Sequence, residues 1–206
     1  MLYNKVTPAD KQMLKNFIDR MGKINVINLN RDQQLAYWIN LYNAEIIYVI
    51  LENYPVKSIM KISSNWFSHG PWDQKMIRVD NRSISLNDIE HGIIRPIWND
   101  PRTHAALNCG SWSCPNLQQI PYQGKIVYQQ LNKATYEFIN SPRAVTVKGD
   151  QLELSQIFDW YNVDFNNDEG VKRFILLFAD KKLKQEVKAT TVVKYQGYDW
   201  LLNQES

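Results

Sequence analysis

Two cysteines, Cys109 and Cys114, stand close together in a segment that also contains His104 and Asn108. The segment covers residues 100–117 and reads DPRTHAALNCGSWSCPNL. A cysteine thiolate is a nucleophile, an imidazole can act as its base, and two nearby thiols can exchange with a disulfide. We therefore expect any reaction centre of this chain to lie here.

Cys114 is the better candidate for an acidic thiol. Pro115 suits the first position of a helix, so Cys114 is expected at a helix start, where unpaired N–H groups and the helix dipole favour a thiolate. The small and apolar residues of 103–109 predict a buried strand, with His104 and Asn108 on one face and Cys109 on the other. The same two cysteines are equally compatible with a small disulfide loop or with inert buried thiols.

A second polar cluster is expected on a helix over residues 85–96. Its start, SLND, is typical of a capping box, and Pro96 is expected to end it. His91 and Arg95 are four residues apart and share a face, whereas Glu90 points about a third of a turn away. We expect this cluster to face the cysteines. In the alternative reading, Glu90 pairs with a neighbouring residue, and His91 caps or packs.

The first function hypothesis is a thiol-dependent enzyme of the acyl-transfer or amide-hydrolysis type. Cys114 or Cys109 would be the nucleophile, and His104 is the first choice of base, before His91. The group that holds the imidazole would be Asp164, Glu90 or Asn108, although the local sequence favours a turn-capping role for Asp164. Papain-like and transglutaminase-like folds usually place the cysteine before the histidine. All three histidines here precede Cys109, so this hypothesis requires a permuted arrangement of such a fold.

Two other function classes remain open. One is a redox module in which Cys109 and Cys114 alternate between dithiol and disulfide, although the chain lacks the C-x-x-C spacing of thioredoxin-type sites. The other is a non-catalytic domain with structural cysteines and a tryptophan-lined groove for a small-molecule or peptide ligand. The spacing of Glu90, His91, His104 and the cysteines matches no zinc pattern, so we expect neither a metal nor a cofactor.

Five blocks of sequence carry a family resemblance. They are YWINLYNA (37–44), SLNDIEHGIIRP (85–96), HAALNCGSWSCPNL (104–117), IFDWY with DF (157–161 and 164–165) and YDWLLN (198–203). In this order they resemble the signature blocks of the DUF547 family, over nearly the whole chain. The resemblance implies one domain of that family, whose bacterial members look secreted or envelope-associated and whose eukaryotic members are fused to DEP and glutaredoxin-like modules. It associates the domain with thiol chemistry or signalling and leaves the reaction open.

Composition favours one globular domain over residues 1–206. The chain is 44% hydrophobic and 12% aromatic, which is enough for one substantial core. Its net charge of +3 is spread along the sequence, so we do not expect nucleic-acid binding. No apolar run is long enough for a membrane span. The compartment is periplasmic or extracellular if a targeting segment has been removed, and otherwise cytoplasmic; the sequence identifies no protein partner.

Hydrophobic spacing predicts a mainly helical α+β fold with small antiparallel hairpins. Helices are expected over 8–21, 31–53, 85–96, 122–140, 157–161 and 167–182, and strands over 75–80, 83–85, 144–147, 152–154 and 190–195. The caps would be Thr7, Asn30 and Ser155, with Ser58 starting a short helix. Residues 63–72, with His69, are expected to form a long loop.

The helix over 31–53 is the expected centre of the fold. Its core stripe would consist of Leu35, Trp38, Ile39, Tyr42, Ile46, Val49 and Ile50. Asn40 and Asn43 lie among these apolar residues, and buried amides need hydrogen-bond partners. They are therefore expected to hold adjacent backbone or, as the alternative, to line a polar site.

Overall fold

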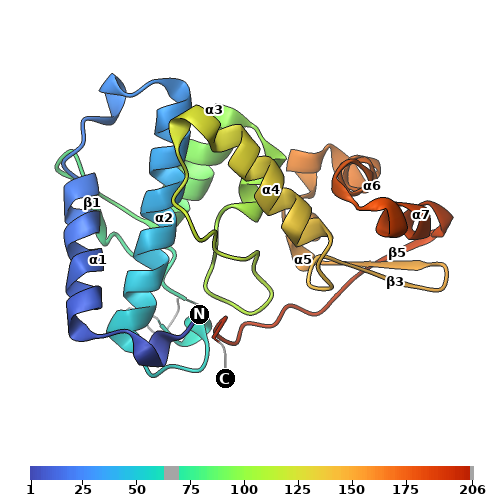
Figure 1. The fold of residues 1–206 in the computed structure, drawn as a ribbon, viewed down its shortest axis with the longest axis horizontal. Coiled ribbons are helices and arrows are strands. Elements are labelled where there is room, and N and C mark those ends of the chain that lie inside the picture. The colour runs from blue at the N-terminus through green and yellow to red at the C-terminus, as the bar shows by residue number, and fades with distance from the viewer. Residues whose placement is uncertain (63–69, 205–206) are drawn as a thin grey trace.

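The long helix α2, Arg31–Asn53, is the central element of the fold (Figure 1). The computed structural model describes residues 1–62 and 70–204. Asn30 caps α2 through a reciprocal capping box with Gln33, and every residue of the predicted core stripe is buried. The helix α1, Pro8–Met21, packs beside α2 and begins with the predicted Thr7 cap. Both helices are confirmed with the predicted bounds.

The remaining elements are short helices and strands, most of which follow α2 along the chain. The short helices are η1 (Tyr3–Lys5), η2 (Val26–Asn28), η3 (Ile59–Lys61), η4 (Asp88–Ile94), η5 (Pro101–Ala105), η6 (Gly124–Ile126) and η7 (Asn162–Phe165). The α-helices are α3 (Arg95–Trp98), α4 (Val127–Ile139), α5 (Gln156–Trp160), α6 (Asn167–Phe178) and α7 (Lys181–Ala189). The strands are β1 (Ile77–Val79), β2 (Arg82–Ile84), β3 (Val145–Lys148), β4 (Gln151–Leu154) and β5 (Val192–Tyr195).

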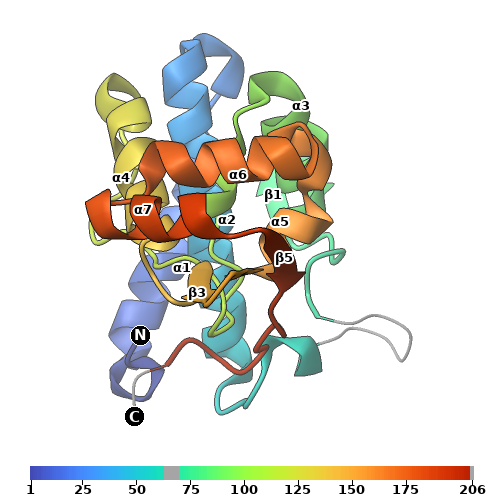
Figure 2. The same cartoon turned by 90° about the vertical axis from the view of Figure 1, so that its right-hand side faces the viewer.

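The strands form two small sheets. β1 and β2 make an antiparallel hairpin, and so do β3 and β4, both as predicted. β5 then adds to β4 in parallel, so the second sheet is mixed. The helices α6 and α7 lie side by side and run across the long axis of α2 (Figure 2). The architecture is therefore the predicted mainly helical α+β fold.

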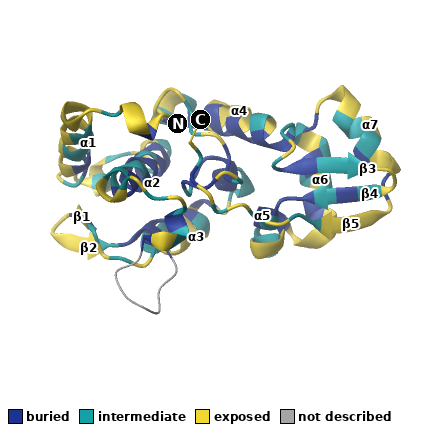
Figure 3. Cartoon of the chain, turned by 90° about the horizontal axis from the view of Figure 1, so that it is seen from below, coloured by how far each residue is buried: buried dark blue, intermediate teal, exposed yellow. Residues whose placement is uncertain are grey.

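Two groups of buried apolar residues make up the interior (Figure 3). The first surrounds α2, and the second lies among α5, α6, β3 and β4. α4 contributes to both, because Leu131 packs in the first group while Phe138 and Ile139 pack in the second. The segment with the cysteines runs between these two regions (Figure 1).

Several predicted elements were wrong in type or extent. Residues 103–109 are buried almost throughout, but they form the end of η5 and a turn instead of a strand. The helix from residue 85 does not end at Pro96. It passes through the π-helix η4 and continues as α3 to Trp98, and Pro96 is the second residue of α3.

The predicted helix over 167–182 is two helices. Asp180 accepts a hydrogen bond from the Leu183 N–H and so caps a separate helix, α7, which the sequence analysis missed. The reciprocal Ser85–Asp88 hydrogen bonds and the Ser155 cap of α5 were predicted correctly. The predicted loop with His69 falls largely on residues 63–69, which lie outside the described residues.

Candidate functional site

The cysteine segment is held against α2 by asparagine side chains. Asn43 donates to the Ala106 carbonyl at 2.9 Å and accepts from the Asn108 N–H at 2.9 Å. Asn40 makes the same paired contact with both backbone groups of Tyr122. Both amides are thereby satisfied, and the prediction that they hold adjacent backbone is confirmed.

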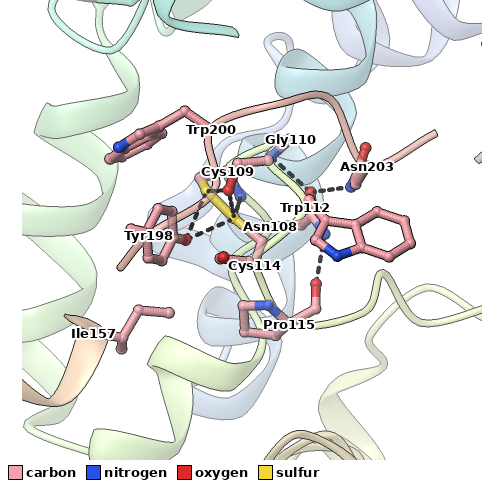
Figure 4. The surroundings of a disulfide bond; sticks show 12 residues. Asn108, Cys109, Gly110, Trp112, Cys114, Pro115, Ile157, Tyr198, Trp200 and Asn203 are labelled. Atoms are coloured by element: carbon pink, nitrogen blue, oxygen red, sulfur yellow. Dashed lines mark hydrogen bonds between the residues drawn. A yellow bond between two sulfur atoms is a disulfide. The ribbon is translucent and has the colours of Figure 1, made fainter. Parts of the chain in front are cut away.

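Asn108 shapes the loop from inside. Its side chain donates to the Pro115 carbonyl at 2.6 Å and accepts from the Gly110 N–H at 2.8 Å and from Asn203 at 3.0 Å (Figure 4). Gly110 has a φ of +82°, a conformation that glycine adopts at little cost. Asn108 therefore ties the two ends of the loop together, and its hydrogen bonds go to these groups and not to an imidazole.

Cys109 and Cys114 are joined in a disulfide, with Cα atoms 6.0 Å apart (Figure 4). Cys114 is 1% exposed, whereas Cys109 is partly exposed. The helix predicted to start at Pro115 is absent, because the chain stays irregular until η6. A helix start therefore does not account for an acidic Cys114 thiol.

Other donors surround the Cys114 sulfur instead. The Cys109 N–H lies 3.0 Å from Cys114 Sγ, and the Ser111 hydroxyl donates to it at 3.3 Å. The Tyr198 hydroxyl lies 3.3 Å from both sulfur atoms (Figure 4). Hydrogen bonds to a sulfur stabilise it most when it carries a negative charge. These groups would favour a Cys114 thiolate if the disulfide opened.

Tyr198 reaches the disulfide because the C-terminal tail pairs with the cysteine loop. The Trp112 N–H donates to the Leu201 carbonyl at 2.7 Å, and the Asp199 N–H donates to the Ser113 hydroxyl at 2.9 Å. Burial is the main cause that raises the pKa of Tyr198 to about 12, so its hydroxyl keeps a proton to donate near neutral pH. The sequence analysis did not connect Tyr198 with the cysteines.

His104 is part of an ionic network with Asp164 and Arg95. Its Nε2 lies 2.7 Å from Asp164 Oδ2, and its ring stacks on Tyr161 with centroids 4.0 Å apart. Arg95 binds both oxygens of the same carboxylate, at 2.7 and 3.0 Å. Burial opposes ionisation of Asp164, but the hydrogen bonds from His104 and Arg95 hold its pKa well below the ordinary value. The His104–Asp164 pairing is the one that the enzyme hypothesis requires.

Glu90 and His91 are separated by the helix that carries them. His91 is exposed and contacts Arg95, with Nδ1 3.0 Å from Nη1. Glu90 is 7% exposed and points inward. Burial first, and then the charge of Glu90, raise the pKa of Tyr42 and Tyr161 above the ordinary tyrosine value. Glu90 is therefore placed at the cavity, whereas His91 lies beside Arg95 on the surface.

A cavity of about 300 Å³ brings most of the predicted site residues together. Glu90, His104, Cys109 and Cys114 line it, and Asp164 supports His104 from behind. Aromatic side chains form much of the remaining wall; they are Tyr42, Trp72, Trp160, Tyr161, Tyr198 and Trp200. Asn108 and His91 are not among the lining residues. A disulfide, an imidazole and a buried carboxylate thus share one pocket of ligand-binding size.

The sequence blocks that build this cavity include those that carried the family resemblance. Residues 26–139 match the family described as "Protein of unknown function, DUF547". The chain belongs to the DUF547 family. The match spans α2, η4 and the cysteine segment, and the elements after α4 complete the cavity of this DUF547 protein. No curated protein matches the chain, and no solved structure does either.

In residues 1–62 and 70–204, no group of three or more His, Cys, Asp or Glu side chains could hold a metal ion. Among the helices of the same residues, none has the length and apolar character needed to cross a bilayer.

Proposed function

We propose that this cavity carries out thiol–disulfide exchange, with Cys109–Cys114 as the exchanging pair. One observation favours this function over the others: the disulfide itself lines the cavity, and Cys114 Sγ receives the Cys109 N–H and the Ser111 hydroxyl. A sulfur held in this way is a good leaving group, because exchange is faster when the departing thiol has a low pKa. An inert structural disulfide needs neither access nor such donors.

The different exposure of the two cysteine residues supports different roles for their sulfurs. Cys109 is partly exposed, so an incoming thiolate attacks Cys109 Sγ and forms a mixed disulfide. The Cys109–Cys114 bond breaks, and Cys114 leaves with the electron pair as a thiolate. A second substrate thiolate then attacks the substrate sulfur of the mixed disulfide. The net exchange converts one protein disulfide and two thiols into a protein dithiol and a small disulfide.

Reduction of the folded protein by 2-mercaptoethanol tests the proposal. N-ethylmaleimide alkylates the free thiols and stops the reaction, and mass spectrometry then measures the mass of the protein. Circular dichroism reports whether the fold persists. We expect two maleimide adducts, on Cys109 and Cys114, at thiol concentrations that leave the fold intact. A disulfide that opens only together with unfolding in denaturant would overturn the proposal.

Acyl transfer is the second candidate, and the His104–Asp164 contact of 2.7 Å favours it. The carboxylate fixes the ring, and His104 lines the same cavity as both cysteines, so the reduced protein offers the parts of a cysteine–histidine–aspartate site. The nucleophile would be the thiolate of Cys109 or Cys114 after the disulfide has been reduced.

Alkylation of the reduced protein separates the two candidates. Limiting iodoacetamide is added between about pH 5 and 9, across the ordinary thiol pKa, and the adduct is mapped to Cys109 or Cys114. A histidine-activated nucleophile is labelled well below the free-thiol pKa, and His104→Ala moves the labelling profile to higher pH. If His104→Ala leaves the profile unchanged, acyl transfer is excluded and exchange remains.

A further inference from the structure

We propose that the thiol accepted by this cavity carries a positive charge near its sulfur, an inference that rests on the exchange function proposed above. Such a thiol is a small aminothiol or a cysteine beside basic residues in a polypeptide. Two independent features of the cavity wall support this substrate class: its formal charges and its exposed aromatic rings.

The charged groups of the wall are acidic. Among the described residues that line the cavity, Asp73 and Glu90 carry carboxylates, and none is a lysine or an arginine. Glu90 is 7% exposed and is absent from the salt bridges of the described residues. No basic side chain of the described wall pairs with the Glu90 carboxylate, and Arg95, whose pKa Glu90 helps to raise, lies outside the lining, so the acidic wall attracts cations into the cavity.

The nearest basic groups are each engaged by other side chains or backbone; the two arginines lie outside the cavity lining, and His104 lies within it. Arg95 is bound to Asp164, and its guanidinium lies over the Tyr161 ring, 4.9 Å from the centroid. Arg143 lies behind the cysteine loop, where it donates to the Cys114 carbonyl at 2.9 Å and to Asn116 at 2.6 Å. His104 is paired with the carboxylate of Asp164. An anionic thiol, such as one that carries a sulfonate, would find no lysine or arginine in the described wall to pair with its charge.

Aromatic rings next to the disulfide provide the second feature. Trp160 and Trp200 stack with centroids 5.7 Å apart, and Tyr198 lies within 4.8 Å of Trp160 and 4.6 Å of Trp200. Trp160 remains 46% exposed. The face of an indole or phenol ring attracts a cation placed above it. Because Tyr198 also contacts both sulfurs, a cation bound by these rings lies close to the disulfide.

Reduction rates with three small thiols test the inference. Cysteamine, 2-mercaptoethanol and 2-mercaptoethanesulfonate are similar in size and are cationic, neutral and anionic. Each rate is divided by the thiolate concentration and by the rate of the same thiol with 2-hydroxyethyl disulfide, which removes intrinsic differences in nucleophilicity. We expect cysteamine to exceed the sulfonate by about tenfold or more at low salt, and the ratio to shrink in about 1 M salt.

Glu90→Gln removes the buried charge and keeps the shape of the side chain. It is expected to lower the cysteamine-to-sulfonate ratio severalfold. The matched control is Glu169→Gln, which removes an exposed carboxylate of α6, paired at 3.5 Å with Arg173, and leaves the ratio at the wild-type value. Equal corrected rates for the three thiols would overturn the charge preference while leaving exchange intact. If none of the three reduces the folded protein, the exchange function itself fails.

Discussion

The two chemical walls of the cavity are built from different kinds of interaction. The imidazole wall is His104, supported from behind by Asp164 and Arg95: the Asp164 carboxylate lies 2.7 Å from His104 Nε2 and accepts from Nε and Nη2 of Arg95. On the sulfur wall, neutral donors surround Cys114, namely the Cys109 N–H and the Ser111 hydroxyl. The first wall is fixed by charge compensation. The donors of the second wall are neutral and can bind a sulfur in a disulfide or in a thiolate, which suits a group that changes its redox state.

Because of this difference, we expect disruption of the imidazole wall to lower the free energy of unfolding more than disruption of the sulfur wall. Asp164→Ala leaves the Arg95 guanidinium and the buried His104 ring without their shared acceptor. We expect the free energy of unfolding to fall by about 2–4 kcal/mol, between the cost of an unsatisfied buried group and that of an uncompensated buried charge. Denaturant unfolding measures it. As a control, Asp19→Ala breaks the exposed Lys15–Asp19 pair and should cost at most about 0.5 kcal/mol.

Acid should weaken the same wall. The folded-state pKa of Asp164 is depressed, so its stabilising effect is fully present above the unfolded pKa of about 3.9. It is lost as the pH falls through the folded pKa. Wild-type protein should therefore lose more stability on acidification below about pH 4 than Asp164→Asn does. If the free energy of unfolding fell equally with pH in the two proteins, the contacts with His104 and Arg95 would not be what keeps Asp164 ionised.

Reduction of the disulfide in the sulfur wall should lower the free energy of unfolding by less than Asp164→Ala does. The Cys109–Cys114 bond closes a loop with a sequence separation of 5, and the chain-entropy cost of so short a loop is small. We expect reduction to lower the free energy of unfolding by about 2 kcal/mol or less. Denaturant titrations of oxidised and reduced protein give the difference. Loss of the fold on reduction would assign the disulfide a purely structural role.

Tyr198→Phe should change the rate of exchange more than it changes stability. The variant loses the hydroxyl 3.3 Å from both sulfurs and keeps the ring that packs against Trp160 and Trp200. Loss of one hydrogen bond to a developing thiolate should slow reduction by 2-mercaptoethanol about tenfold. Tyr195→Phe, which removes a hydroxyl 3.1 Å from Asp168, is the matched control and should leave the rate unchanged. Unchanged exchange in Tyr198→Phe would remove the hydroxyl from the mechanism.

Local sequence signals predicted the imidazole wall better than the sulfur wall. Helical spacing located α2 and the Glu90 helix, and the caps at Thr7, Asn30 and Ser155 fixed helix starts, because these features depend on neighbouring residues. The residue types at His104 and Asp164 suggested a pair, although only the tertiary fold brings them together across 60 positions.

The sulfur wall depends on contacts that no local pattern encodes. Pro115 suggested a helix start, but Asn108 binds the Pro115 carbonyl and holds that segment in an irregular loop. Tyr198 reaches Cys114 from 84 positions away, through pairing of the C-terminal tail with the loop. The strand predicted over 103–109 failed for a similar reason, because small apolar residues fit any buried conformation and Asn43 selects the observed turn.

The most direct test of exchange at Cys109 uses the two single-cysteine variants. Cys114→Ser and Cys109→Ser are each treated with 2-hydroxyethyl disulfide under conditions that keep the protein folded, and the mixed disulfide is followed by mass spectrometry. Because Cys109 is partly exposed and Cys114 is 1% exposed, Cys114→Ser should form the adduct at least about tenfold faster. Equal rates, or a faster reaction of Cys109→Ser, would contradict the assignment of Cys109 as the sulfur that exchanges with substrate.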